Sequence, residues 1–278
     1  MRTGPNPLLM VLLSLPPVAP AAAGDMDRGI AVLAYHRFDP LHGGSTTVTT
    51  QAFERQLDWL DAHGYRVVAL GTVVESLRGT TGSVLGDVVA WGRTVAITVD
   101  DGHVSVYTQL YPIVRRRHVP VTLFIYPSAI SHAAYALTWG QLADMTLSGL
   151  VTVQSHTYWH PNFHVERTRR TAADYRAFLD DQLVRSKAVL ERRLGAPVDM
   201  LAWPFGIVDA DLRAAAVRAG YRAAFAYGGG PAHRGVDPFA IPRLPMSDAD
   251  QGTVLAARLG DAGLDNRLAP AAPGRAVP

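Results

Sequence analysis

The sequence contains no cysteine, which excludes disulfide bonds and a lipid-modified cysteine. It also has very little lysine. Lys187 is the only one, and positive charge comes from arginines that acidic residues balance to a net charge of +2. A nucleic-acid-binding protein needs a basic face interleaved with aromatic side chains, which this dispersed charge does not provide. We therefore expect no nucleic-acid partner, and a fold stabilised by its apolar core, because 48% of the residues are hydrophobic.

Long hydrophobic runs are also absent, and only a short one stands near the N-terminus. Arg2 precedes the apolar residues 8–15, and residues 21–23 are all alanine. This is the pattern of a signal peptide, and the apolar run is too short to span a bilayer. We expect a signal peptide at residues 1–23, export to the periplasm or the medium, and no stable membrane span in the mature protein. An uncleaved anchor or a disordered tail is the alternative.

The rest of the chain is expected to form one domain over residues 24–260, followed by a disordered Ala/Pro-rich tail at 261–278. In this domain, almost wholly apolar strands alternate with stretches of helical periodicity, which is typical of a buried parallel sheet. We expect an α/β fold, specifically a (β/α) barrel that is distorted or incomplete and has seven to eight parallel strands. A doubly wound open sheet is the alternative.

The individual elements follow from the same pattern. Strands are expected at residues 30–35, 67–70, 95–99, 121–126, 151–153, 200–203, 223–227 and 240–244. Helices are expected from about residue 53 to 62 and at residues 72–78, 105–118, 139–147, 172–194, 209–219 and 253–259, with Pro112 shortening or kinking the third. In either fold, an active site would lie at the carboxyl ends of the strands.

Two polar motifs stand at such strand ends. Asp100 and Asp101 follow one strand, and His156 and His160 follow another. Taken alone, the Asp100-Asp101 motif has an alternative interpretation, which is an ordinary strand-to-helix turn with Asp as the N-cap. On a helical turn, two histidines four residues apart share a face, so together with one Asp they could bind one divalent metal. The second carboxylate would then remain free to accept a proton, as hydrolysis by metal-activated water requires.

A third motif, Trp203-Pro204-Phe205-Gly206, follows the strand at 200–203. Its simple interpretation is a Pro-Gly turn packed with aromatic side chains. Its functional interpretation is that the motif forms one side of the active site, where a backbone N–H group exposed near the metal could donate a hydrogen bond to an oxyanion.

Together the three motifs resemble those of polysaccharide deacetylases, the NodB-homology family also called carbohydrate esterase family four. The sequence Thr98-Val99-Asp100-Asp101-Gly102 is similar to the family's T-F-D-D-G motif, residues 156–160 to H-[ST]-x-x-H, and residues 203–206 to R-x-P-Y-G, in the same order. The resemblance covers about residues 31–259. Tyr35-His36 and Ile241-Pro242-Arg243 resemble the branch that deacetylates exported poly-N-acetylglucosamine.

The resemblance implies a role for each matched residue. Asp101, His156 and His160 would bind the metal, most often zinc, with cobalt, nickel or iron as alternatives. Asp100 would be the general base, and the backbone N–H of Phe205 would help to stabilise the oxyanion. The side chains expected to line a sugar groove are Trp203, Pro204 and Trp159. The expected activity is removal of N-acetyl groups from an N-acetylglucosamine-containing polysaccharide.

The sequence also departs from the family pattern. The motif arginine aligns with Ala202, and the late catalytic histidine has no clear equivalent near Arg243. Arg243 is our candidate to replace the missing arginine beside the base. His36 is the candidate general acid, although it could equally be an ordinary loop residue.

Other functions fit parts of the same pattern. An O-acetyl esterase acting on xylan-type polymers would use the same residues. A carbohydrate-binding relative that had lost turnover would explain the two departures. A non-haem iron oxygenase also uses two histidines and a carboxylate, but usually on a β-rich scaffold with closely spaced ligands.

Overall fold

The computed structural model of the chain describes residues 29–79 and 93–261. The expected signal peptide and nearly all of the expected tail lie outside these residues. Within them, no helix has both the length and the apolar character needed to cross a bilayer.

The core of the fold is a curled sheet whose strands pair in parallel. Along the sheet the order is β10-β1-β5-β6-β7-β8-β9, and β4 also pairs with β5. The strands are β1 (Ala31–Tyr35), β4 (Arg66–Val67), β5 (Thr94–Asp100), β6 (Val121–Ile125), β7 (Val151–Ser155), β8 (Met200–Ala202), β9 (Ala223–Phe225) and β10 (Leu244–Pro245). A separate small parallel pair consists of β2 (Arg37–Asp39) and β3 (Thr47–Thr49).

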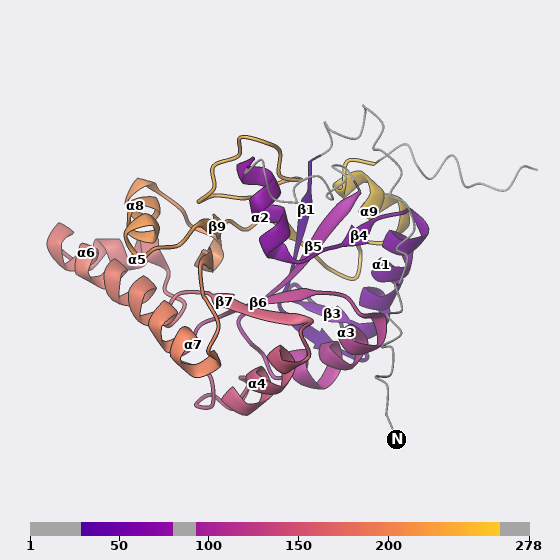
Figure 1. Ribbon diagram of the computed structural model, residues 1–278, viewed down its shortest axis with the longest axis horizontal. Coiled ribbons are helices and arrows are strands. Elements are labelled where there is room, and N and C mark those ends of the chain that lie inside the picture. The colour runs from indigo at the N-terminus through magenta and orange to yellow at the C-terminus, as the bar shows by residue number, and fades with distance from the viewer. Residues whose placement is uncertain (1–28, 80–92, 262–278) are drawn as a thin grey trace, which may run out of the picture.

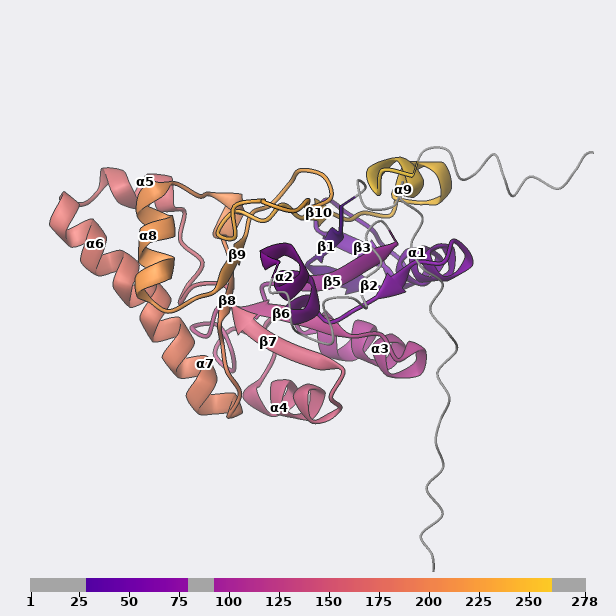
Figure 2. The same cartoon turned by 45° about the horizontal axis from the view of Figure 1, so that its top comes forward.

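Helices lie around the outside of this sheet (Figures 1 and 2). They are α1 (Thr50–Ala62), α2 (Leu70–Arg78), α3 (Tyr111–Arg117), α4 (Trp139–Leu147), α5 (Phe163–Thr168), α6 (Ala172–Asp180), α7 (Ser186–Leu194), α8 (Ala210–Arg218) and α9 (Gly252–Arg258). Connections between parallel strands must cross from one end of the sheet to the other, and most of the helices lie in these crossovers.

An irregular segment, residues 238–243, links the two ends of the sheet. The N–H of Ala226 donates to the carbonyl of Ile241, and the N–H of Gly228 donates to that of Arg243. The same segment continues into β10, which pairs with β1. The fold is therefore a distorted (β/α) barrel, as the sequence predicts. The last strand is shorter than expected, because Ile241 and Arg243 make only isolated bridges, to Phe225 at the end of β9 and to Gly228 in the loop after it.

Two expected helices contain a π-helical turn. The predicted helix at 105–118 begins with a π turn at Val106–Leu110 and continues as α3, with Pro112 in its first turn. Proline has no N–H to donate and crowds the carbonyl four residues earlier, so the hydrogen-bond register changes there. The predicted helix at 172–194 consists of α6 and α7, joined as one rod by a π turn at Asp181–Arg185 (Figure 1).

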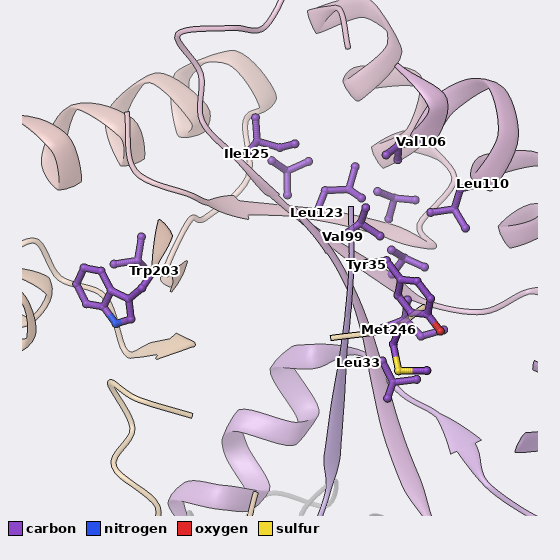
Figure 3. Close-up of a cluster of buried hydrophobic side chains, with 14 of the residues drawn as sticks. Leu33, Tyr35, Val99, Val106, Leu110, Leu123, Ile125, Trp203 and Met246 are labelled. Carbon is purple, nitrogen blue, oxygen red and sulfur yellow. The ribbon is translucent and has the colours of Figure 1, made fainter. Parts of the chain in front are cut away.

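Both faces of the sheet are buried. In the larger hydrophobic cluster, Leu33, Val99 and Leu123 of three neighbouring strands pack with Val106 and Leu110 (Figure 3). A smaller cluster, which includes Val32, Ala96 and Phe124, lies on the opposite face. Burial of both faces explains the unbroken apolar strands. The polar strand ends are therefore the positions left for chemistry.

Candidate metal centre

The residues predicted to carry chemistry meet at the carboxyl ends of the strands. Asp100 ends β5, His156 directly follows β7, and His36 directly follows β1. Phe205 lies in a single 3-10 turn at Pro204–Gly206, just after β8. Parallel strands place all these ends at one edge of the sheet, so residues far apart in the sequence come together.

Asp101, His156 and His160 each direct one ligand atom to a common point. These three atoms lie within 4.8 Å of one another. The Oδ1 atom of Asp101 is 3.6 Å from the Nε2 atoms of both histidines, and it is buried without a hydrogen-bond partner among residues 29–79 and 93–261. A buried carboxylate oxygen without a partner is costly unless it binds a cation. Two imidazole nitrogens and one carboxylate oxygen suit a divalent metal such as zinc.

His156 is held in the tautomer that metal binding needs. Its Nδ1 atom is 2.8 Å from the carbonyl oxygen of Ala202, which can only accept, so Nδ1 carries the proton and Nε2 presents its lone pair to Asp101. Burial lowers the pKa of His156 to about 3, and burial also lowers the pKa of His160. Both rings are therefore neutral at pH 7.

The histidine pair does not lie on a helical turn, so this part of the prediction is wrong. Residues 156–160 form an irregular loop in which Thr157 and His160 have φ values of 65° and 64°. The N–H of His160 donates to Oγ1 of Thr157 over 3.2 Å, which closes the loop. Left-handed backbone at these positions turns both imidazoles toward Asp101, whose own φ is 72°. Such strained conformations persist where function and the surrounding packing demand them.

Asp100 is fixed by Arg243. The Nη1 and Nη2 atoms of Arg243 donate to Oδ1 and Oδ2 of Asp100, each over 2.7 Å. Both side chains are nearly completely buried, with 0% of Arg243 and 2% of Asp100 exposed. Burial raises the pKa of Asp100, but Arg243 and then His156 outweigh this effect and hold it well below its usual range. Arg243 thus provides the guanidinium group beside the expected base, Asp100, which Ala202 at the position of the motif arginine cannot provide.

The pKa values of the two neighbouring carboxylates, Asp100 and Asp101, shift in opposite directions. Burial, followed by the negative charge of Asp100, raises the pKa of Asp101 to about 6. This is the carboxylate that faces the two neutral histidines. A cation between these groups would stabilise the ionised form of Asp101, so the arrangement fits a metal ligand beside a permanently ionised neighbour.

Phe205 brings its ring to the site, and its backbone has an unusual conformation. Its φ of 57° is left-handed, and the N–H groups of Gly206 and Ile207 donate within the turn. In the described part of the chain, the N–H of Phe205 donates to no protein acceptor. The ring is 61% exposed and stands edge-on to His160, with the centroids 4.7 Å apart.

Trp203 and Pro204 do not line a groove, so the prediction for these two side chains is wrong. Trp203 is 0% exposed and belongs to the buried hydrophobic cluster drawn in Figure 3. Its indole N–H donates to the carbonyl of Phe239 over 2.9 Å. Pro204 is also buried. The chain direction at the end of β8 turns the indole into the core, where its N–H finds a partner. Trp159, by contrast, is 41% exposed and lies beside His160.

His36 lies at the edge of the same site. It is within electrostatic range of both Asp100 and Asp101, and its ring meets that of Tyr227 edge-on, with the centroids 5.5 Å apart. This position is compatible with proton transfer to a group bound near the two carboxylates.

One neighbour of the site was missed in the sequence. Tyr126 directly follows β6, and its ring lies 5.5 Å from that of His160, measured between centroids. Its hydroxyl is 2.9 Å from that of Tyr135. The signal was available, because Tyr126 directly follows its strand as His36 and His156 follow theirs. Its partner Tyr135 lies on a loop and had no such signal.

Comparison with known proteins gives a consistent assignment. The family model for polysaccharide deacetylase matches residues 89–224, which include Asp100, both histidines of the cluster and Phe205, whereas His36 and Arg243 lie outside the match. YxkH of Bacillus subtilis (strain 168), whose name refers to the same family, is 25% identical over 228 residues, covering 82% of this chain and 75% of that protein.

A second relative and a solved structure are also similar to this chain. A poly-beta-1,6-N-acetyl-D-glucosamine N-deacetylase of Staphylococcus epidermidis is 24% identical over 235 residues, covering 78% of each chain. The structure of the deacetylase PplD of Streptococcus pyogenes has the same fold, with a TM-score of 0.71 and 20% identity over 83% of this chain and 98% of that one.

Proposed function

Because the chain belongs to the polysaccharide deacetylase family, we propose that it removes N-acetyl groups from an N-acetylglucosamine-containing polysaccharide with the help of a divalent metal. The observation that carries this proposal is the cluster of Asp101, His156 and His160 with the ionised Asp100 beside it. The substrate class is supported by the Staphylococcus epidermidis relative, which is named for poly-beta-1,6-N-acetyl-D-glucosamine.

The metal would be held by the three ligand atoms that converge in the structure. When bound, a divalent cation such as zinc supplies positive charge that polarises the acetyl carbonyl and lowers the pKa of a water molecule. The side chains of the protein supply the rest of the chemistry.

Asp100 is the candidate general base. Its Oδ2 atom is 3.8 Å from Nε2 of His156, so it borders the space between the ligands. The low pKa of its carboxyl keeps it ionised throughout the neutral range, and Arg243 prevents it from rotating away. Asp100 would take one proton from the attacking water as the C–O bond forms.

The N–H of Phe205 would donate to the oxygen that becomes negative when the acetyl carbonyl is attacked. The C–N bond then breaks, acetate forms, and the leaving amine needs one proton. Either His36 or the proton held by Asp100 can supply it. Arg243 replaces the motif arginine at the base, which removes one of the two arguments for a relative without turnover.

The deciding experiment is acetate release from poly-N-acetylglucosamine, chitin oligosaccharides, peptidoglycan and acetylxylan, each with and without a chelator. We expect chelator-sensitive release from the N-acetylglucosamine polymers. Release from acetylxylan alone would identify an O-acetyl esterase. Absence of release from every substrate with zinc, cobalt, nickel or iron added would contradict the proposed function and favour a binding protein.

We also propose that the protein is exported, since residues 1–23 have the pattern of a signal peptide. The intact mass of protein recovered from the periplasm or the medium of an expressing cell tests this. A chain that starts near residue 24 is expected, and uncleaved protein confined to the cytoplasm would contradict it.

A further inference from the structure

The π turn at Asp181–Arg185 joins α6 and α7 into one rod and contacts the histidine loop, residues 156–160 (Figure 1). We propose that this turn positions the histidine loop, and that Gln182 is its positioning residue for the metal ligand His160. The inference rests on the proposed function in one respect, because it takes His160 to bind a metal.

The first argument is that the sequence of the rod gives no local reason for a π turn. The other π turn, at Val106–Leu110, is followed by Pro112, which removes one N–H donor from its helix. Residues 172–194 contain neither proline nor glycine. A π turn interrupts the regular hydrogen bonding of an α-helix and is found frequently at functional sites. We therefore attribute this turn to contacts outside the rod.

The second argument is that two side chains of the turn reach the histidine loop. The N–H of Trp159 donates to Oε1 of Gln182 over 3.2 Å, and Gln182 is 1% exposed. A backbone N–H can only donate, so the side-chain oxygen of Gln182 faces the loop. The guanidinium of Arg185 lies over the ring of Tyr158, 3.8 Å from its centroid. The turn thus contacts the two residues that directly precede His160.

The rod also holds the start of the loop. Ser186 is the first residue of α7, and Ser155 is the last residue of β7. Their Oγ atoms lie 2.8 Å apart, and both residues are completely buried. The Oγ atom of Ser155 also accepts from the N–H of Thr157 over 3.2 Å. Contacts with the rod therefore reach the loop at its beginning and near its end.

These contacts fall on the strained part of the loop. Thr157 and His160 have left-handed backbone, which costs free energy at residues other than glycine and persists where the surroundings fix it. Ser155 holds the N–H of Thr157, and Gln182 holds the N–H of Trp159, directly before His160. Without the bond to Gln182, the metal-free loop should sample other conformations. Ordering it again when a metal binds would then weaken the binding.

The turn is itself anchored in the core, so it can hold the loop in place. The hydroxyl of Tyr221 donates to the carbonyl of Leu183 within the turn over 3.0 Å, and both residues are buried. Bonds from Ile125 and Ser128 also hold the loop, but they join backbone groups, which almost any residue provides. The bond to Gln182 uses a side chain, so a substitution can remove it.

Zinc affinity is the first test. Gln182→Met keeps the length of the side chain but removes the acceptor oxygen. The affinity of the whole protein for zinc, measured at pH 7.5 by competition with a chelating dye, should fall about tenfold, the lower end of the range for groups that orient metal ligands. Gln182→Glu keeps an acceptor oxygen and should recover most of this affinity.

Gln56→Met is the matched control. Gln56 is 0% exposed and lies on α1, where its side chain makes hydrogen bonds with Tyr35, Ser247 and Asp250. This variant should lower the free energy of unfolding, measured with urea, at least as much as Gln182→Met does, because several bonds are lost. Its zinc affinity should stay the same. Equal losses of zinc affinity in the two variants would show a general effect of stability and overturn the positioning role.

Amide hydrogen exchange of the metal-free proteins, followed by mass spectrometry, is the second test. Peptides covering residues 156–160 should exchange faster in Gln182→Met and at the original rate in Gln56→Met. Arg185→Met, at a side chain that is 52% exposed, provides a second variant should Gln182→Met fail to fold. It removes the cation over Tyr158 and should also speed exchange in these peptides.

Unchanged zinc affinity together with unchanged exchange of the loop in both rod variants, Gln182→Met and Arg185→Met, would overturn the positioning role and leave the proposed function intact. If the protein neither binds zinc nor releases acetate, but exchange of the loop still depends on Gln182, the positioning of the loop stands and the proposed function fails.

Discussion

Arg243 and Asp100 form a buried, two-pronged ion pair, with both donor–acceptor distances at 2.7 Å. Arg243 also donates to the carbonyl of Ala226 and to Oγ1 of Thr98, so its guanidinium is anchored on three sides. Planar guanidinium groups are preferred for such sites because they match the two oxygens of a carboxylate. The pair therefore orients the expected base and also makes the protein depend on keeping both partners.

The first prediction concerns the stability contributed by this pair. Arg243→Met leaves the carboxylate of Asp100 buried without its partner, which should lower the free energy of unfolding by about 3–5 kcal/mol. Urea unfolding measures this change. Arg213→Met, which breaks an ion pair with Asp237 whose two side chains are 40% and 39% exposed, is the matched control and should cost less than about 1 kcal/mol. Equal stability of the two variants would contradict a structural role for the buried pair.

The positioning role of Arg243 is separated from its structural role by Arg243→Lys. Lysine keeps the positive charge but carries it on one ammonium nitrogen, which cannot donate to both carboxylate oxygens as the planar guanidinium group does. We expect folded protein with activity reduced roughly 10- to 100-fold, as for other residues that orient a reacting group. The fall should be in kcat, with KM nearly unchanged, because Arg243 is buried and cannot touch substrate. A change confined to KM would argue against positioning of Asp100.

The second prediction concerns Asp100 itself. Asp100→Asn preserves the size of the side chain but removes the proton acceptor, so turnover should fall roughly 10²- to 10⁴-fold. The metal content should stay the same, because Asp101 supplies the carboxylate that faces the histidines. Acetate release and elemental analysis of the same preparation test both statements. Near-full activity would show that Asp100 is not the base.

The architecture and the members of the metal cluster could be predicted because they follow local rules. Parallel strands buried on both faces read as unbroken apolar runs, and the polar residues at their ends must share one edge of the sheet. The sequence alone therefore predicts that Asp101, His156 and His160 lie together. Because Ala202 stands where the family motif has arginine, it also predicts that Arg243 lies beside Asp100, as the structure shows.

Side-chain direction and loop conformation could not be predicted in the same way. Trp203 points into the core because of the path of the chain at the end of β8. The sequence does not reveal this direction, because an indole N–H can donate to a sugar as well as to a backbone carbonyl such as that of Phe239. The histidine loop depends on left-handed backbone at Thr157 and His160, which non-glycine residues seldom adopt. Tertiary contacts impose this conformation, so the spacing alone suggested a helix.

The third prediction tests the corrected role of Trp203. Trp203→Phe removes the hydrogen bond to Phe239 and part of a fully buried ring, so the free energy of unfolding should fall by about 1–3 kcal/mol. KM for an oligosaccharide should stay the same, because the side chain has no exposed surface. Thermal unfolding and steady-state kinetics test the two statements. A large increase in KM with unchanged stability would restore Trp203 as a substrate contact.

The last prediction is the pH dependence of metal binding. A metal ion competes with a proton for each ligand atom. Burial, with the nearby charge of Asp100, raises the pKa of Asp101 to about 6, whereas burial lowers the pKa values of His156 and His160. Well above pH 6 Asp101 is therefore ionised, and the lowered pKa values of the two histidines favour unprotonated rings. Below pH 6 Asp101 takes up a proton, so the affinity for zinc should fall about tenfold for each further pH unit, since one proton is displaced.

Competition with a chelating dye between pH 5 and pH 7.5 measures this affinity for the whole protein. Asp101→Asn removes the titrating carboxylate, so its remaining weak affinity should change little over the same range. His160→Ala keeps Asp101 and should retain a dependence centred near pH 6 at lower overall affinity. If the unchanged protein instead lost affinity mainly between pH 7 and pH 6.5 and Asp101→Asn behaved alike, histidine protonation would govern binding. The burial of the two imidazoles would then not have the electrostatic effect described here.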